Sequence, residues 1–292
     1  MGFGQDHPNW DVEGRDWPNR GASRFVEAGG LRWHVQTAGA GPTLLMLHGT
    51  GSATHSWRDL LPRLSGRFSV IAPDLPGHGF TSTPSSSGLS LRGMAGLVDA
   101  LLQKLDQKPE IVVGHSAGAA ILAAMALQGL SRPRILIALN GALLPMRGSG
   151  LFAPLARLLF LNPLAPRIFS WRAEDTRATR RLLEGTGSHI DEAGIEFYAR
   201  LFRKSGHVAA TLGMMANWEL DWLEKRLPRL DMPLLLVAGR NDKAVPVSQA
   251  RDLAARLPTA RLMEIDGGHL VHEERPDAVA ELIQDEAGVD IG

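Results

Sequence analysis

Serine, aspartate and histidine occur in this chain in the order and settings that a nucleophilic triad requires. Ser116 lies in the string GHSAG, directly after the apolar run EIVV, while Asp242 ends VAGRND and His269 ends IDGGH. A serine hydroxyl is a poor nucleophile at neutral pH unless a nearby base accepts its proton and an acid orients that base. The sequence therefore predicts Ser116 as nucleophile, His269 as general base and Asp242 as the acid.

The GHSAG string is expected to form a tight turn between a strand and a helix. The run EIVV predicts a buried strand, and the following AGAAILAAMALQGL predicts a helix that packs closely on a sheet. Gly114 and Gly118 suit such a turn, because neighbouring backbone must pass close to it. The turn would lift Ser116 above the carboxyl ends of the strands and aim the Ala117 N–H at a developing oxyanion.

A second oxyanion donor is expected from the string LHGTGSATHSW, which follows another buried apolar run. We predict the Thr50 N–H as that donor, with Gly51 next to it and His48 bracing the loop. A plain glycine-rich turn is the alternative interpretation. His78, in DLPGHGFT, is expected to be a turn residue and not a base.

Other residues fit the acid and base roles less well. Asp266 is only three positions before His269, Asn140 ends a predicted strand but cannot be a carboxylate, and His272 falls in the next turn. The alternative that Asp242 is simply a strand-end turn residue, and that His269 is a surface histidine, stays open. The string HLVHEE lacks a third ligand, so no metal site is predicted.

The pattern around these residues predicts an α/β fold. An opening hairpin at 23–39 precedes short apolar runs that alternate with helical segments, which argues for a mostly parallel sheet flanked by helices. We expect residues 1–141 and 221–292 to form this core. Residues 142–220 break the alternation and are predicted to form a helical cap inserted over the sheet edge.

The cap is apolar and rich in arginine, with soft methionine side chains that suit a large flat hydrophobic ligand. Arginines beside such a pocket could pair with the carboxylates of a porphyrin. Packing of the same residues on the sheet is an open alternative, and contact of the string LFAPLARLLFLNPL with a membrane surface is another. We assign substrate contact to Leu144, Met214, Met215 and Val245.

Composition excludes several classes of function. The chain has 31 Lys and Arg against 31 Asp and Glu, so its net charge does not suggest nucleic acid as a partner. The absence of cysteine excludes disulfides and thiolate metal sites. No phosphate-binding loop and no cofactor motif occur, and no run is apolar enough to span a membrane. We expect a cytoplasmic protein without a cofactor.

These motifs, in this order, resemble the α/β-hydrolase fold family along essentially the whole chain. More particular strings resemble the magnesium chelatase accessory family of bacteriochlorophyll biosynthesis: GTGSATHSWRDLLP, LNGALLP, TGSHID and MMANWELDWL. The second resemblance implies a role near the insertion of Mg²⁺ into protoporphyrin IX, magnesium chelatase subunits as partners, and a location that reaches the periphery of the photosynthetic membrane. It maps the hydrolase motif onto Ser116, Asp242 and His269.

Two functions follow from these observations. The first is a serine hydrolase, of esterase type, acting on a hydrophobic and perhaps tetrapyrrole substrate. The second is a non-catalytic porphyrin-binding module that assists magnesium insertion and keeps the triad without using it. The sequence alone leaves both open.

Overall fold

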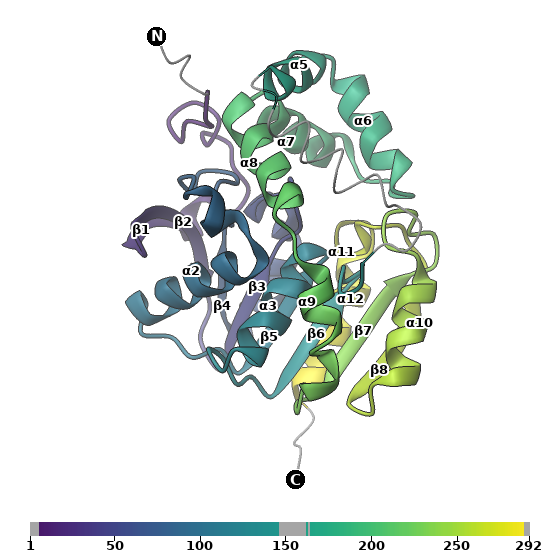
Figure 1. Ribbon diagram of the computed structural model, residues 1–292. Coiled ribbons are helices and arrows are strands. Elements are labelled where there is room, and N and C mark those ends of the chain that lie inside the picture. The colour runs from purple at the N-terminus through teal and green to yellow at the C-terminus, as the bar shows by residue number, and fades with distance from the viewer. Residues whose placement is uncertain (1–5, 146–161, 163, 289–292) are drawn as a thin grey trace.

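A single mixed sheet forms the centre of the molecule (Figure 1). The computed structural model describes residues 6–145, 162 and 164–288, and within them it places eight strands in the order β1-β2-β4-β3-β5-β6-β7-β8. The strands are β1 (Ser23–Ala28), β2 (Leu31–Ala38), β3 (Thr43–Leu47), β4 (Ser69–Pro73), β5 (Ile111–His115), β6 (Ile135–Leu139), β7 (Leu234–Gly239) and β8 (Ala260–Ile265). Each one falls inside a segment predicted as a strand.

Strand directions agree with the predicted mostly parallel sheet. β1 and β2 form an antiparallel hairpin, and β2 also pairs antiparallel with β4, whereas the pairs from β4 to β8 are all parallel. The hairpin closes at Gly29 and Gly30, whose φ angles of 57° and 76° suit the turn that joins two twisted strands. The carboxyl ends of the parallel strands therefore lie along one edge of the sheet.

Helices cover both faces, which explains why the central strands are apolar along most of their length. In β3, Leu45 and Leu47 join the core cluster that includes α2 (Leu91–Lys104) and α3 (Ala117–Leu127). Leu44 and Met46 join the cluster on the opposite face. That face is covered by α1 (Leu60–Leu64) and α12 (Pro276–Gly288), and α10 (Val247–Arg256) packs beside β7 and β8.

Between β6 and β7 the chain leaves the alternating pattern, as predicted for the cap. Figure 1 shows α5, α6 and α7 beyond the end of the sheet, with α8 leading back toward α9. These helices are α5 (Ala165–Arg172), α6 (Thr176–Gly185), α7 (Glu192–Phe202), α8 (Ser205–Ala216) and α9 (Leu220–Glu224). Residues 146–161 and 163 lie outside the described part of the chain, so 142–220 remains the predicted extent of the cap.

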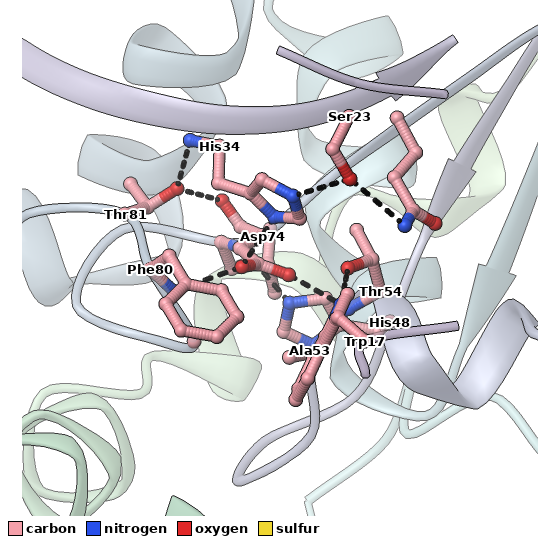
Figure 2. A network of polar contacts seen from close by, with 12 residues as sticks. Trp17, Ser23, His34, His48, Ala53, Thr54, Asp74, Phe80 and Thr81 are labelled. Atoms are coloured by element: carbon pink, nitrogen blue, oxygen red, sulfur yellow. Dashed lines mark hydrogen bonds and ion pairs between the residues drawn. The ribbon is translucent and has the colours of Figure 1, made fainter. Parts of the chain in front are cut away.

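The carboxylate of Asp74, directly after β4, ties the opening hairpin to the loops above the sheet (Figure 2). Its Oδ1 accepts the Thr54 N–H at 2.7 Å, and its Oδ2 accepts the His34 Nδ1–H at 2.8 Å and the Phe80 N–H at 2.9 Å. His34 continues to the Ser23 hydroxyl at 3.0 Å. Burial alone would raise the pKa of Asp74, but His34 and these donors hold that pKa well below its ordinary value.

We predict that Asp74→Asn lowers the free energy of unfolding by about 1–3 kcal/mol, because an amide nitrogen cannot accept a bond from the buried N–H groups that face it. Urea unfolding at pH 7 measures the change. Asp277→Asn is the matched control, since Asp277 is exposed and pairs with Arg63 at the surface; it should stay within about 0.5 kcal/mol of wild type. Equal unfolding midpoints for the two variants would contradict the role given to Asp74.

Candidate active site

Ser116 stands on a strained turn between β5 and α3. Its backbone has φ 50° and ψ −116°, a conformation that non-glycine residues seldom adopt. The surrounding backbone holds it there: the Ser116 N–H donates to the Leu139 carbonyl at 3.0 Å, and the Ser116 carbonyl accepts the Ala142 N–H at 3.0 Å. Strain of this kind persists only where neighbouring structure supports it, and it is found mainly at functional sites.

The glycines around Ser116 are required by close backbone approach, as the sequence predicts. A methyl group on Gly114 would lie 2.3 Å from the Ala119 nitrogen, and one on Gly118 would lie 2.1 Å from the Leu47 carbonyl oxygen. On the facing loop, a methyl group on Gly49 would lie 3.0 Å from Cβ of Ser116. The loop of residues 48–53 therefore runs directly beside the serine.

Asp242 and His269 meet as the sequence predicts for an acid and a base. Oδ2 of Asp242 lies 2.8 Å from Nδ1 of His269, and Oδ1 accepts the N–H groups of Ala244 and Val245, both at 2.8 Å. Asp242 is buried, so these donors replace the water that its carboxylate has lost. A histidine bonded through Nδ1 has Nε2 left to act on a substrate or a nucleophile.

His115 connects the serine turn to the loop that carries His269. Its Nε2 lies 2.8 Å from the His269 carbonyl oxygen, and the two rings are 4.8 Å apart. In the described part of the chain no direct hydrogen bond joins the Ser116 hydroxyl to His269. Catalytic hydrogen bonds often form only when substrate is bound, so this geometry is compatible with a triad.

The two predicted oxyanion donors flank the serine. Ala117 is the first residue of α3, where backbone N–H groups have no partner within the helix, and Thr50 follows Gly49 in the facing loop. Among the described residues, neither N–H donates to a protein acceptor. His48 braces the loop as expected, because its Nε2 accepts the Leu75 N–H at 2.9 Å and its Nδ1 lies 2.8 Å from the Gly49 carbonyl oxygen.

The four predicted substrate contacts lie in different surroundings. Met214 comes nearest to the site, since its Sδ accepts the Thr50 hydroxyl at 3.5 Å. Met214 and Leu144 are buried in the same core cluster as Ala117. Met215 is exposed, and Val245 lies beside the acid through its bond to Asp242. Their contact with substrate remains a prediction.

The expectation of a membrane-facing string, LFAPLARLLFLNPL, falls almost wholly on residues outside the described part of the chain. Phe152, Leu158 and Phe160, expected to roof the site, lie there too. In the described residues, no three His, Asp or Glu side chains gather as ligands of a metal ion would.

Comparison with known proteins identifies the family. A family model described as "Alpha/beta hydrolase family" matches residues 44–282. The chain belongs to the α/β hydrolase family. A solved α/β hydrolase fold protein from Burkholderia ambifaria superposes with a TM-score of 0.76 at 25% identity, covering 90% of this chain and 97% of that one.

Two curated relatives extend the comparison. This chain is 41% identical over 278 residues to a protein named "Magnesium-chelatase 30 kDa subunit" from Rhodobacter capsulatus, covering 92% of this chain and 96% of the relative. It is 30% identical to "Uncharacterized hydrolase YugF" from Bacillus subtilis, over 86% of this chain and 92% of that one. The predicted resemblance to a family of magnesium chelatase accessory proteins is thereby confirmed.

Asn140 is a site residue that the sequence reasoning passed over. It follows β6 with a φ of 48°, and its Nδ2 donates to Asp242 Oδ2 and to the Gly268 carbonyl, both at 2.7 Å. Its Oδ1 accepts the Gly239 N–H at 3.0 Å. Asn140 therefore joins the loop of the acid to the loop of the base. Asparagine after a strand, in a position that requires positive φ, is the signal that could have drawn attention to it.

A buried polar chain joins the loop of residues 48–53 to the cap. The hydroxyls of Ser52 and Tyr198 lie 3.1 Å apart, and Tyr198 in α7 donates to Oε1 of Glu273 at 2.8 Å. Oε2 of Glu273 forms an ion pair with Arg58. Burial raises the pKa of Glu273 to about 7, against the opposing effect of Arg58. The cap and the loop of residues 48–53 therefore share one network, and its carboxyl, Glu273, lies four residues after His269 in the sequence.

Histidines fill much of the interior around this site. Burial lowers the pKa of six histidines: His48, His55, His78, His115, His207 and His272. The pKa of His207 falls to about 4. His207, in α8, bonds the Gly51 carbonyl at 3.1 Å and accepts the Gly79 N–H at 3.2 Å. Neither ring nitrogen of His55 or His272 has a hydrogen-bond partner in the described part of the chain. Neutral imidazole is the form that suits these positions.

We predict that Asn140→Ala slows the reaction of Ser116 with a fluorophosphonate about tenfold or more, because Asp242 and the His269 loop lose their shared hydrogen-bond donor. The second-order labelling rate measures the effect, and circular dichroism confirms the fold. Asn241→Ala is the matched control, since Asn241 is exposed and next in sequence to Asp242. A labelling rate for Asn140→Ala equal to that of the control would refute the positioning role.

Acid is predicted to destabilise the protein below pH 6.5, the ordinary histidine value, because the unfolded chain then binds protons that the six buried imidazoles do not. The loss continues toward pH 4, where His207 titrates in the folded state. Glu273 acts in the opposite direction between pH 7 and 4.5, and so does Glu274, whose pKa burial also raises. These two carboxyls are outnumbered by the six buried histidines. Unfolding free energies from urea titrations across this range measure the slope.

The variant His55→Phe tests the cause of this slope. It removes a titrating group whose ring nitrogens make no hydrogen bond to the described residues, so proton uptake on unfolding below pH 6.5 should fall by about one proton. An unchanged slope would show that His55 titrates normally in the folded state.

Proposed function

We propose that this α/β hydrolase is a serine hydrolase that cleaves an ester or similar acyl bond of a hydrophobic substrate, in the tetrapyrrole chemistry around magnesium insertion. One observation carries the proposal: the strained Ser116 turn has N–H groups on both sides, from Thr50 and Ala117, that find no acceptor among the described residues, and His115 ties this turn to the bonded Asp242–His269 pair. A binding module has no need of strain at a serine or of an acid that orients a histidine.

The mechanism follows from the positions of these groups. The Ser116 hydroxyl attacks the carbonyl carbon while Nε2 of His269 accepts its proton, and Asp242 stabilises the imidazolium that forms. The N–H groups of Thr50 and Ala117 hold the oxyanion, a type of donor worth about 2.7–4 kcal/mol each. His269 then protonates the leaving group, and water releases the acyl group from Ser116 by the same steps in reverse order.

The substrate class rests on two supports. The relationship to a protein named as a magnesium chelatase subunit favours a tetrapyrrole and chelatase subunits as partners. The apolar surroundings of the serine, with Met214 against Thr50, favour a large hydrophobic acyl or alcohol group. We propose substrate contact for Met214, Leu144, Met215 and Val245 on this basis.

A second candidate is a non-catalytic module that binds a porphyrin and assists magnesium insertion. The name of the same relative, a chelatase subunit and not a hydrolase, favours it. Under this alternative the Ser116 turn would be retained as structure, and the protein would act by delivering or holding the porphyrin.

We predict that a fluorophosphonate labels wild type at Ser116 and leaves Ser116→Ala unlabelled, since only an activated serine reacts with it at a useful rate. Mass spectrometry identifies the labelled residue. Ser86→Ala, at the exposed start of a short 3-10 helix, should label like wild type. Wild type that stays unlabelled while a known serine hydrolase reacts in the same tube would overturn the catalytic proposal.

Two further measurements separate the candidates. Titration of protoporphyrin IX, followed at its Soret band, reports porphyrin binding without any catalysis. Expression of Ser116→Ala in a host that depends on this gene for pigment reports whether catalysis matters there. Full pigment together with a Soret shift would favour the binding module, whereas lost pigment in a folded variant would favour the hydrolase.

A further inference from the structure

The outer face of α5 exposes a stripe of large apolar side chains. Leu164, Ile168 and Trp171 are 57%, 54% and 74% exposed. Their spacing of four and then three residues places them on one face of the helix. Phe169 is 46% exposed beside them. Exposed apolar residues are ordinary when single, but a contiguous stripe that includes a tryptophan indicates an interaction surface.

This stripe is part of a helix that is fixed to the cap on its other side. Ala165, about a quarter turn around the helix from the stripe, packs with Val208 and Leu212 of α8 in one small cluster. Pro166 and Ala173 are also buried. The exposed stripe is therefore held in place by packing underneath, and it does not become buried by a rotation of α5.

Positive charge borders the stripe. Arg167 and Arg172 lie on either side of the face that carries Ile168 and Trp171, by their positions on the helix. From residue 165 to residue 185, which covers α5, α6 and the turn between them, there are five arginines against three acidic residues, an excess of two positive charges. Apolar side chains flanked by arginines form the pattern of a helix that lies in a membrane interface.

We propose that α5 docks this hydrolase onto a lipid bilayer that carries anionic headgroups. Leu164 and Ile168 would enter the acyl boundary, and Trp171 would lie at the headgroup level. Arg172, at one border of the stripe, would pair with a lipid phosphate while its stem stays in apolar surroundings. Figure 1 places α5 at the outer end of the cap, opposite the C-terminus, where a flat surface can reach it.

The structure favours a bilayer over a protein partner. Trp171 stands out from the surface at 74% exposure, whereas the aromatic anchors of protein interfaces are mostly enclosed in well-packed pockets. In the described residues no helix is long and apolar enough to cross a membrane. α5, with eight residues, would lie in the plane of the interface and bind reversibly.

Co-sedimentation of the full-length protein with vesicles tests the proposal. Vesicles of phosphatidylcholine alone are compared with an equal mixture of phosphatidylcholine and phosphatidylglycerol. We expect binding to the anionic vesicles, and a loss of about tenfold or more in the partition coefficient for Ile168→Asp. Met263→Asp is the matched control: it adds the same charge at an apolar residue of β8 that is 41% exposed, and it should bind like wild type.

A second measurement tests the same contact without introducing an aspartate on α5. Brominated anionic lipids should quench part of the tryptophan fluorescence of wild type. The quenched fraction should be clearly smaller in Trp171→Phe. Ser116→Ala should bind vesicles like wild type, because docking does not require catalysis. A failure of the membrane-docking proposal can therefore be distinguished from a failure of the proposed serine hydrolase function.

Three results would overturn the proposal. Wild type that stays in the supernatant with anionic vesicles excludes a bilayer as the occupant of this face. Equal binding by Ile168→Asp and Met263→Asp excludes α5 as the contact. A lipid-free dimer that Ile168→Asp dissociates would assign the stripe to a second copy of the chain.

Discussion

Between Gly118 and the carbonyl oxygen of Leu47 there is room for a hydrogen atom and nothing larger, since a methyl group would lie 2.1 Å from that oxygen. β3 and β5 pair in parallel with Leu47 opposite Gly114, so the loop after β3 meets the first turn of α3. This contact sets Thr50 and Ala117 on either side of Ser116. Backbone packing thus brings together the proposed nucleophile and its proposed oxyanion donors, with little dependence on side-chain rotamers.

The acid and the base depend on a different kind of support. Asp242 and His269 come from loops after β7 and β8, and both loops could shift without breaking the sheet. Asn140 limits that freedom because one amide group bonds the carboxylate of Asp242 and the backbone of Gly268. Its own positive φ is a local cost that these bonds offset. The site thus combines a rigid half made of backbone with a second half held by one buried amide.

Sequence patterns were sufficient for the fold but only for part of the site. Short apolar runs marked the strands because both faces of the sheet are covered, as in β3, and the pair Gly29–Gly30 marked the hairpin. The spacing of Asp242 and His269 also predicted that they would meet. Asn140 was set aside as unable to act as an acid, because nothing local shows that its amide bonds a residue 102 positions away.

The interior histidines escaped sequence reasoning for a related reason. A histidine in a loop string such as GTGSATHSW looks exposed, whereas His55 is fully buried against Tyr198 of the cap. Burial there depends on how α7 covers the loop, which is a tertiary contact over more than a hundred residues. The exposed stripe on α5 could not be predicted for the same reason. Which face of α5 points outward depends on the packing of Ala165 against α8.

The chain from Ser52 through Tyr198 to Glu273 has a consequence for motion of the cap. While α7 is in place, Glu273 holds its proton up to a pH of about 7, because water cannot reach it. A displacement of α7 that let water reach this carboxyl would return its pKa toward the ordinary 4.5. Opening would then release a proton at any pH between these two values. If α7 is displaced in this way, a more alkaline solution favours the displaced form, because the released proton is then bound again less readily.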